Sequence, residues 1–125
     1  METIEINGEE YIKKSEANTF QPAEKLDGLT YGIFRTYSAG VFAGYKKTRE
    51  GKEAVVLQSR RLYYWEGAFT LSQIAEEGVA KPDECKFAME ITGEHELTEV
   101  IEFIPCTEKA RLSIKNVPNH DYNNN

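Results

Sequence analysis

The chain has 125 residues, a formal net charge of −6, a hydrophobic fraction of 40% and two cysteines. The length predicts one domain with a modest core, and the hydrophobic fraction is too high for a disordered chain. The acidic balance argues against a nucleic-acid polymer as partner, since affinity for such polymers comes mainly from Lys and Arg side chains, and two cysteines do not make a disulfide framework.

The first 30 residues predict a hairpin arm followed by a linker. Ile4 and Ile6 alternate with polar residues ahead of Asn7-Gly8, the strongest short signal for a hairpin. Residues 15–30 break any periodic pattern and predict a long connection. The start lacks the basic and apolar regions of a secretory signal, and no apolar run approaches the roughly 18 residues of a membrane helix. We therefore expect a cytoplasmic protein without a membrane partner.

Residues 31–118 predict a compact ligand-binding domain, and the polar residues 119–125 predict a flexible tail. The predicted strands cover residues 31–36, 41–48, 53–57, 60–65, 86–92 and 97–104, and the predicted helices cover 70–79 and 107–117. The last strand has apolar residues on both faces, which predicts an interior strand. Because the connections are of hairpin length, the predicted fold class is α+β, an antiparallel sheet of about five to six strands with two short helices.

The two helices carry recognisable end signals. Thr70 and Gln73 fit a capping box, and Gly78 stands where a C-terminal glycine belongs. The second helix is expected to begin after Thr107 and to bury one stripe, made of Ala110, Ile114 and Val117.

The sequence contains no recognisable catalytic or metal-binding pattern. The two histidines, His95 and His120, have no neighbour at metal-ligand spacing, and the cysteines form no Cys-x-x-Cys. Neither a phosphate-binding loop nor a nucleophile elbow is present. We expect a protein that is not an enzyme and needs no cofactor or metal. A distant pair of acids among the 21 acidic residues leaves nucleotide hydrolysis as an alternative.

The segment from Arg60 to Trp65 is the densest candidate for binding. Alternation in a strand places Arg61, Tyr63 and Trp65 on one face, and Arg60 shares the opposite face with Leu62 and Tyr64. Guanidinium groups bind phosphate oxygens and aromatic rings stack on bases, so either face suits a nucleotide-like anion. The structural alternative is that the rings form core and the arginines are solvated or paired with acids.

Three further positions suit an anion or a base. The helix start at Thr107, with Arg111 one turn on, has free amides beside a guanidinium, although a plain capped helix is the commoner arrangement. Ser38 and Gly40 lie in a turn whose amides suit an anion, with a simple tight turn as the alternative. Phe87 is a core residue by its alternation with Met89 and Ile91, and its ring is free to stack only near a strand end.

Several of these segments together resemble a family of small phage proteins. The segments are 35–41 (RTYSAGV), 60–65 (RRLYYW), 71–75 (LSQIA), 97–102 (LTEVIE) and 105–108 (PCTE). The combination is similar to the first Thoeris anti-defence family, the phage signal sponges, over about residues 31–118.

The resemblance implies a homo-oligomer in the host-cell cytoplasm that sequesters cyclic ADP-ribose isomers, and in some members cyclic oligonucleotides, without altering them. It implies arginines for the phosphates, here Arg60 or Arg61 and Arg111, and Phe87 for the adenine, with the ligand near a subunit interface. An asparagine expected near the 86–97 hairpin is absent, where Glu94 and His95 stand instead. The alternative function is a small acidic inhibitor that covers a host protein through exposed aromatic residues.

Overall fold

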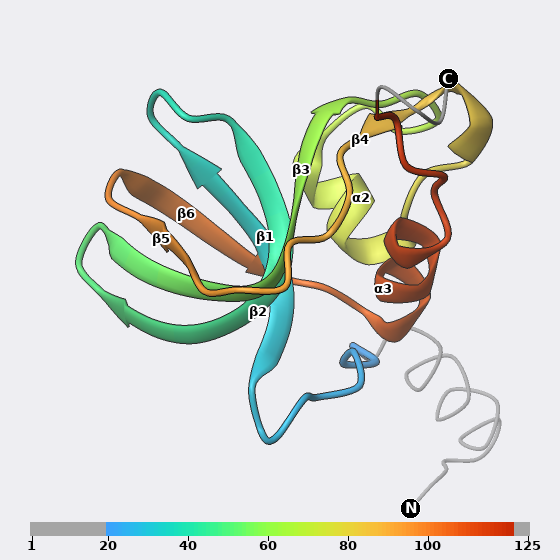
Figure 1. Ribbon diagram of the computed structural model, residues 1–125. Coiled ribbons are helices and arrows are strands. Elements are labelled where there is room, and N and C mark those ends of the chain that lie inside the picture. The colour runs from blue at the N-terminus through green and yellow to red at the C-terminus, as the bar shows by residue number, and fades with distance from the viewer. Residues whose placement is uncertain (1–19, 122–125) are drawn as a thin grey trace, which may run out of the picture.

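The described chain forms one curled antiparallel sheet with helices packed against one side of it (Figure 1). The computed structural model describes residues 20–121, so the predicted hairpin within residues 3–13 and the last four residues of the tail lie outside the described part. The elements in chain order are β1 (Thr30–Thr36), β2 (Val41–Glu50), β3 (Glu53–Tyr64), α2 (Leu71–Glu77), η1 (Pro82–Glu84), β4 (Lys86–Phe87), β5 (His95–Leu97), β6 (Val100–Pro105) and α3 (Glu108–Lys115). The fold is therefore the predicted α+β class.

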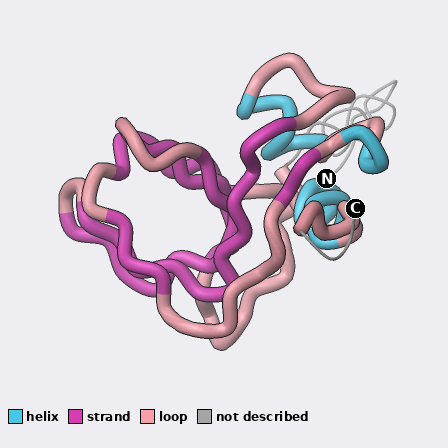
Figure 2. The backbone as a smooth tube through the Cα atoms, turned by 45° about the horizontal axis from the view of Figure 1, so that its top comes forward, coloured by secondary structure: helices cyan, strands magenta, loops and turns pink. Residues whose placement is uncertain are grey.

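The sheet has the strand order β4-β3-β2-β1-β6, and β5 pairs with the first half of β3. Only Thr98 and Glu99 separate β5 from β6, yet β5 pairs with β3 while β6 pairs with β1. The two consecutive strands thus join opposite sides of the sheet. Figure 2 shows the result, a barrel-like ring of strands beside the helices.

The interior of this barrel is a small apolar core. Phe103 packs against its buried residues, which are Phe34, Phe42, Ala54, Val56, Leu97 and Val100. Gly32 on β1 is paired with Gly44 on β2. A Cβ atom at Gly32 would lie 2.5 Å from the Phe103 ring and from the carbonyl oxygen of Ile104. The close packing of β1 against β6 therefore requires a residue without a side chain at this position.

The opposite face of β1, β2 and β3 packs against α2 and α3 in a second and larger core, which includes Tyr31, Ile33, Leu62 and Phe87. Thr70 and Thr107 cap the two helices by accepting backbone N–H groups three residues on, and Gly78 ends α2 with φ +80°. The predicted stripe of α3 is confirmed, because its three residues are all buried: Ala110, Ile114 and Val117.

A bulge in β3 decides which core each later residue of this strand faces. Two residues of β3, Gln58 and Ser59, stand opposite the single residue Gly44 of β2. Gln58 has φ +53°, a left-handed conformation that few non-glycine residues adopt. One extra residue in a strand exchanges its two faces. Simple alternation from the start of β3 would therefore assign each residue beyond Ser59 to the wrong face of the sheet.

The register shows this exchange directly. Before the bulge, Val56 faces the barrel interior. Beyond it, Arg61 is paired with Phe42, whose ring belongs to the barrel interior, and Arg60 is paired with Ala43, which belongs to the helical core. The two adjacent arginines thus serve different regions of the molecule.

Three strand predictions are wrong in detail. Residues 53–57 and 60–65 form one continuous strand, because the bulge at Gln58 bends the chain without ending the pairing. The strand predicted at 86–92 is short, and only Lys86–Phe87 forms β4. The interior strand predicted at 97–104 is instead divided at Glu99, and its second half pairs only with β1 among the described strands and exposes Ile101.

Residues on either side of the predicted domain also contact the core. Ala23 is buried and its amide donates to the carbonyl oxygen of Cys106 at 3.1 Å. At the other end, the amide of His120 donates to the carbonyl oxygen of Phe87 at 2.9 Å. The compact domain therefore extends at least from Ala23 to His120, beyond the predicted bounds of 31–118 at both ends.

Candidate functional site

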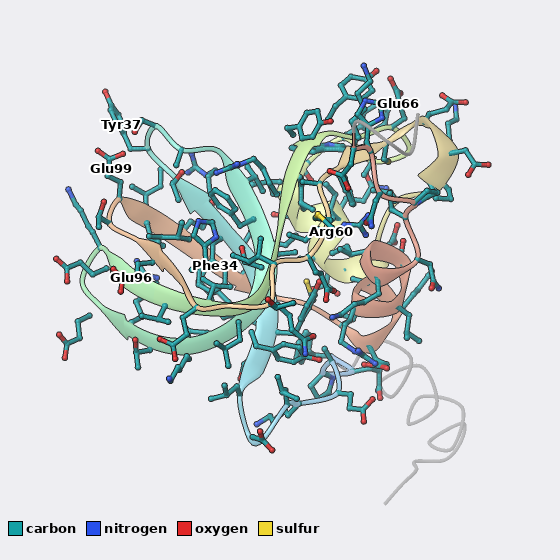
Figure 3. The ribbon with its side chains drawn as sticks, in the orientation of Figure 1. Phe34, Tyr37, Arg60, Glu66, Glu96 and Glu99 are labelled. Atoms are coloured by element: carbon teal, nitrogen blue, oxygen red, sulfur yellow. The ribbon has the colours of Figure 1, made fainter. Side chains whose placement is uncertain are left out.

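Arg60 is buried in the helical core, with 2% of its surface exposed. Figure 3 shows its side chain directed from β3 toward the helices. The guanidinium donates to four oxygens: Ala88 O at 2.6 Å, Ile114 O at 2.7 Å, Val117 O at 2.5 Å and Asn119 Oδ1 at 2.9 Å.

These contacts give Arg60 a structural task. Two of its acceptors are the carbonyl oxygens of Ile114, in the last turn of α3, and of Val117, just after the helix, where backbone oxygens carry partial negative charge. Burial lowers the pKa of the guanidinium from its ordinary value, but arginine stays charged in proteins. Arg60 thus fastens α3 and the segment after β4 to β3, and four of its five N–H groups are already used.

Arg111 is held by two acids. Its guanidinium donates to both carboxylate oxygens of Glu108, at 2.9 and 2.8 Å, and lies 3.2 Å from a carboxylate oxygen of Glu24. Only 13% of the side chain is exposed. The bidentate bond to Glu108 raises the pKa of Arg111 and lowers the pKa of Glu108 to about 2. A ligand phosphate would have to displace a carboxylate to reach this guanidinium.

The amides of Glu108 and Ala110 at the start of α3 are also occupied. Thr107 Oγ1 accepts the amide of Ala110 at 3.0 Å and donates to the carbonyl oxygen of Glu76 at 2.7 Å. The amide of Glu108 donates to the carbonyl oxygen of Gln21 at 3.0 Å. The structure therefore uses Thr107 as a buried cap that joins α3 to α2.

The turn with Ser38 and Gly40 lies at the far end of the barrel from the helices, where Figure 3 places Tyr37 beside Glu99. The hydroxyl of Ser38 donates to the carboxylate of Glu99, and the amide of Tyr37 donates to the Glu99 carbonyl oxygen at 3.0 Å. Gly40 has φ +108°, which the turn requires. The Ser38 hydroxyl is thus bound to a protein carboxylate, and the Tyr37 and Ala39 amides are bound to protein oxygens.

The two aromatic candidates belong to the helical core. Phe87 is completely buried, and Trp65 is partly buried against the same cluster. The Arg60 guanidinium lies 5.4 Å from the Phe87 ring centre. The core interpretation of Phe87 is therefore the one that the structure supports.

Arg61 differs from these groups because it is exposed and, among the described residues, forms no hydrogen bond or ion pair through its side chain. Its guanidinium lies 4.7 Å from the centre of the Phe42 ring. Around it is a hollow of about 70 Å³, lined by Phe42, Ser59, Arg61, Ala88, Met89, Ile91 and His95. We call this cavity the Arg61 hollow. In a chain of net charge −6, its lining has a guanidinium and no carboxylate.

His95 forms one wall of the Arg61 hollow. Its ring meets Phe42 edge-on, with centres 4.9 Å apart, and its Nδ1 lies 2.8 Å from Ser59 Oγ. Burial, together with the charge of Arg61, lowers the pKa of the imidazole, so the neutral form prevails at pH 7. The rim is apolar, since Met89 is 54% exposed and Ile91 is also exposed.

Of the eight candidate residues, the structure places only Arg61 in an accessible, unpaired setting. It does not bring Arg60, Arg61 and Arg111 together within one chain. The residues around Arg61 that the sequence did not single out as binding candidates are Phe42, Ser59, Ala88, Met89, Ile91 and His95. The sequence does contain a signal for Phe42. Pairing residues one by one outward from the hairpin turn at Gly51 places Phe42 opposite Arg61.

Residues 20–121 contain no group of three or more His, Cys, Asp or Glu side chains arranged to hold a metal ion. No helix in this part of the chain is long and apolar enough to cross a membrane.

Comparison with known proteins gives one match. Residues 29–114 match the family described as a domain of unknown function, DUF6948, a span that begins beside β1 and ends within α3. No curated protein and no solved structure matches the chain.

Proposed function

Because the chain belongs to the DUF6948 family, whose function is unknown, we propose its function from its residues: it binds and sequesters a small phosphate-bearing nucleotide signal of the cyclic ADP-ribose type. In this proposal the protein performs no chemistry on the ligand and acts by withdrawing it, as a phage protein would to silence a bacterial immune signal. The resemblance to the sponge family supplies the ligand class. The Arg61 hollow supplies the observation that carries the proposal.

The argument begins with charge. The described arginines other than Arg61 are engaged: Arg35 donates to Glu102, Arg49 to Gly51 O, Arg60 to carbonyl groups, and Arg111 to Glu108 and Glu24. An unpaired guanidinium over an aromatic ring, with no acid in the surrounding wall, is favourable for a phosphate group. The Phe42 ring beneath it fixes the guanidinium by a cation–π contact.

The size of the hollow limits what one chain can hold. Pockets for small ligands commonly measure about 300–1,000 Å³, and the Arg61 hollow measures about 70 Å³. It therefore accommodates one phosphate group of a nucleotide and leaves the base and sugars outside. The exposed Met89 and Ile91 at the rim offer apolar surface to the rest of the ligand or to a second copy of the chain.

A sequestering protein must also bind tightly. A signal present at micromolar concentration requires a binding free energy of about −10 kcal/mol or better. One charge-assisted contact contributes about 1.5–3 kcal/mol, so the hollow alone falls short. The proposal thus requires further contacts outside the hollow, and it predicts self-association of the loaded protein.

The test is calorimetric titration of the full chain with cyclic ADP-ribose isomers and with cyclic di- and trinucleotides. We expect tight binding of at least one of them, and Arg61→Gln should weaken it about tenfold to a hundredfold. Arg49→Gln is the matched control, since this exposed arginine donates to Gly51 O at 2.9 Å and lies outside the Arg61 hollow, and it should bind like the wild type. Absence of binding to every probe, or equal binding by Arg61→Gln, rejects the proposal.

The fate of the ligand distinguishes sequestration from hydrolysis. The loaded protein is denatured by heat and the released molecule is identified by mass spectrometry. Recovery of the intact ligand is the expected result. A hydrolysed product would establish an enzyme in place of a binding protein.

A further inference from the structure

The imidazole of His95 has one nitrogen that the protein leaves unused. Nδ1 lies against Ser59 Oγ at 2.8 Å, whereas Nε2 has no partner among residues 20–121. The buried side-chain N and O atoms that lack partners in this part of the chain are Tyr31 Oη and Asp121 Oδ2. Nε2 is not one of these buried atoms, so it is accessible to solvent. The ring that carries it lines the Arg61 hollow.

Ser59 determines which nitrogen carries the proton. Its hydroxyl is buried, with 2% of the residue exposed, and His95 Nδ1 is its hydrogen-bond partner. If Nδ1 carried the proton, the serine hydroxyl would accept this bond and its own hydrogen would remain buried without an acceptor, which is unfavourable. The serine therefore donates to Nδ1, and the neutral ring carries its proton on Nε2. His95 thus presents an N–H donor to solvent at the wall of the hollow.

We infer that His95 is a second ligand-binding residue, and that Arg61 and the Nε2–H group bind two oxygens of a single phosphate group in the hollow. The inference rests on the proposed function and adds to it the chemistry that the site selects. Both side chains pack on the Phe42 ring, at 4.7 Å for the guanidinium carbon and 4.9 Å for the imidazole centre. Because both also line the same cavity of about 70 Å³, one compact anion can contact both.

This arrangement selects for a phosphate with at least two free oxygens. Neither donor can accept a hydrogen bond in the proposed state, because arginine has no acceptor and the acceptor nitrogen of His95 is bound to Ser59. A hydroxyl or an amine in the hollow would leave its own hydrogens without acceptors there. The cavity volume of about 70 Å³ admits a group of the size of one phosphate. Phosphate diesters and pyrophosphates meet these conditions, and a nucleoside does not.

The test compares two replacements of His95 with two probes, inorganic pyrophosphate and cyclic ADP-ribose. His95→Phe keeps a ring against Phe42 and removes the donor, so binding of both probes should weaken about tenfold or more. His95→Gln retains an N–H donor and should stay within about threefold of the wild type. Glu94→Gln, next in the chain and paired with exposed Lys47, is the control and should bind normally.

A measurement without ligand tests the orienting role of Ser59. Nitrogen chemical shifts of His95 should report the Nε2–H form in the wild type at pH 7.5 and a mixture of the two neutral forms in Ser59→Ala. A wild-type protein with the proton on Nδ1 contradicts the inference. If binding depends on Arg61 but is equal in the wild type and His95→Phe, the role of His95 is rejected and the proposed function stands. If the wild type binds neither of these two probes, the inference fails, and the proposed function fails as well if the other cyclic nucleotides also do not bind.

Discussion

Arg60 and Arg61 are adjacent in β3, yet they lie in two regions with different roles. In the helical region Arg60 is buried, and its N–H groups are bound by oxygens of the segment after β4, of α3 and of Asn119. In the barrel region Arg61 is exposed over Phe42 and forms no ion pair within the described chain. One guanidinium holds the fold together, and the other is left unpaired, as the proposed ligand site requires.

The difference shows that residue type does not determine the role of an arginine beside aromatic residues. Alternation guarantees that two neighbours in a strand face opposite sides. The bulge at Gln58 then decides which of the two faces the helices. Without the extra residue, Arg61 would face the helical core and Arg60 the barrel side. A local irregularity of the backbone therefore decides which of the two arginines is buried and which is left exposed.

The largest expected effect comes from removing the structural arginine. Arg60→Met keeps much of the side-chain volume but leaves Ala88 O, Ile114 O and Val117 O without this donor. Buried acceptors that lose their partner cost about 1–3 kcal/mol each, so we expect the free energy of unfolding to fall by about 3 kcal/mol or more. Urea denaturation followed by circular dichroism measures this change.

The matched variant is Arg61→Met, which loses only the cation–π contact with Phe42 and should cost less than about 1 kcal/mol. The comparison fails if Arg60→Met is as stable as the wild type and loses ligand binding, since the two arginines would then have exchanged roles.

A smaller effect is expected at the bulge itself. A Cβ atom at Gly44 would lie 2.5 Å from Val56 Cγ1 and 2.8 Å from the carbonyl oxygen of Leu57, so Gly44→Ala forces β2 and β3 apart. Overpacking of this kind costs about 1–3 kcal/mol, and the shift should also displace Arg61 and weaken ligand binding. Thermal denaturation and titration measure the two effects.

Gly93→Ala is the control for this substitution, because its Cβ would meet no atom within 4 Å and the expected change is below about 1 kcal/mol. Normal ligand affinity in a destabilised Gly44→Ala would show that the bulge does not position the hollow.

The sequence predicts the fold class, both helix caps and the buried stripe of α3, because each depends on local signals: Thr70 and Thr107 at the helix starts, and apolar spacing along α3. It also predicts that Arg60 and Arg61 face opposite sides. It does not predict which side is core, since this depends on a bulge that no residue pattern announces. The division of residues 97–104 into β5 and β6 depends on curling of the whole sheet and has no local signal either.

The candidate site was less predictable than the fold. The sequence predicts Arg61 as a candidate from its context, and the hairpin register places Phe42 opposite it, because the extra residues at Lys47 on β2 and at Gln58 on β3 cancel. His95 comes from a segment that the sequence describes only as a turn. Its position beside Arg61 depends on the pairing of β5 with β3, a contact between distant segments. Sequence patterns of short range cannot reveal such a contact.

The smallest expected effect concerns Arg111, the third arginine predicted to bind ligand. It tests whether Arg111 has a structural role like Arg60 or a binding role as proposed for Arg61. The bidentate bond from Arg111 holds the pKa of Glu108 at about 2, below the ordinary value of about 4.3 in the unfolded chain. A carboxyl group with a lowered pKa stabilises the fold above the unfolded value, and this contribution is lost as the pH falls toward the folded value. The wild type should therefore be more stable than Glu108→Gln above pH 5, and the difference should shrink between pH 4 and pH 2 in urea denaturation. Such a profile, with unchanged ligand affinity at pH 7, groups Arg111 with the structural arginine. A loss of affinity in Glu108→Gln with no dependence of stability on pH would instead move the pair to the binding surface.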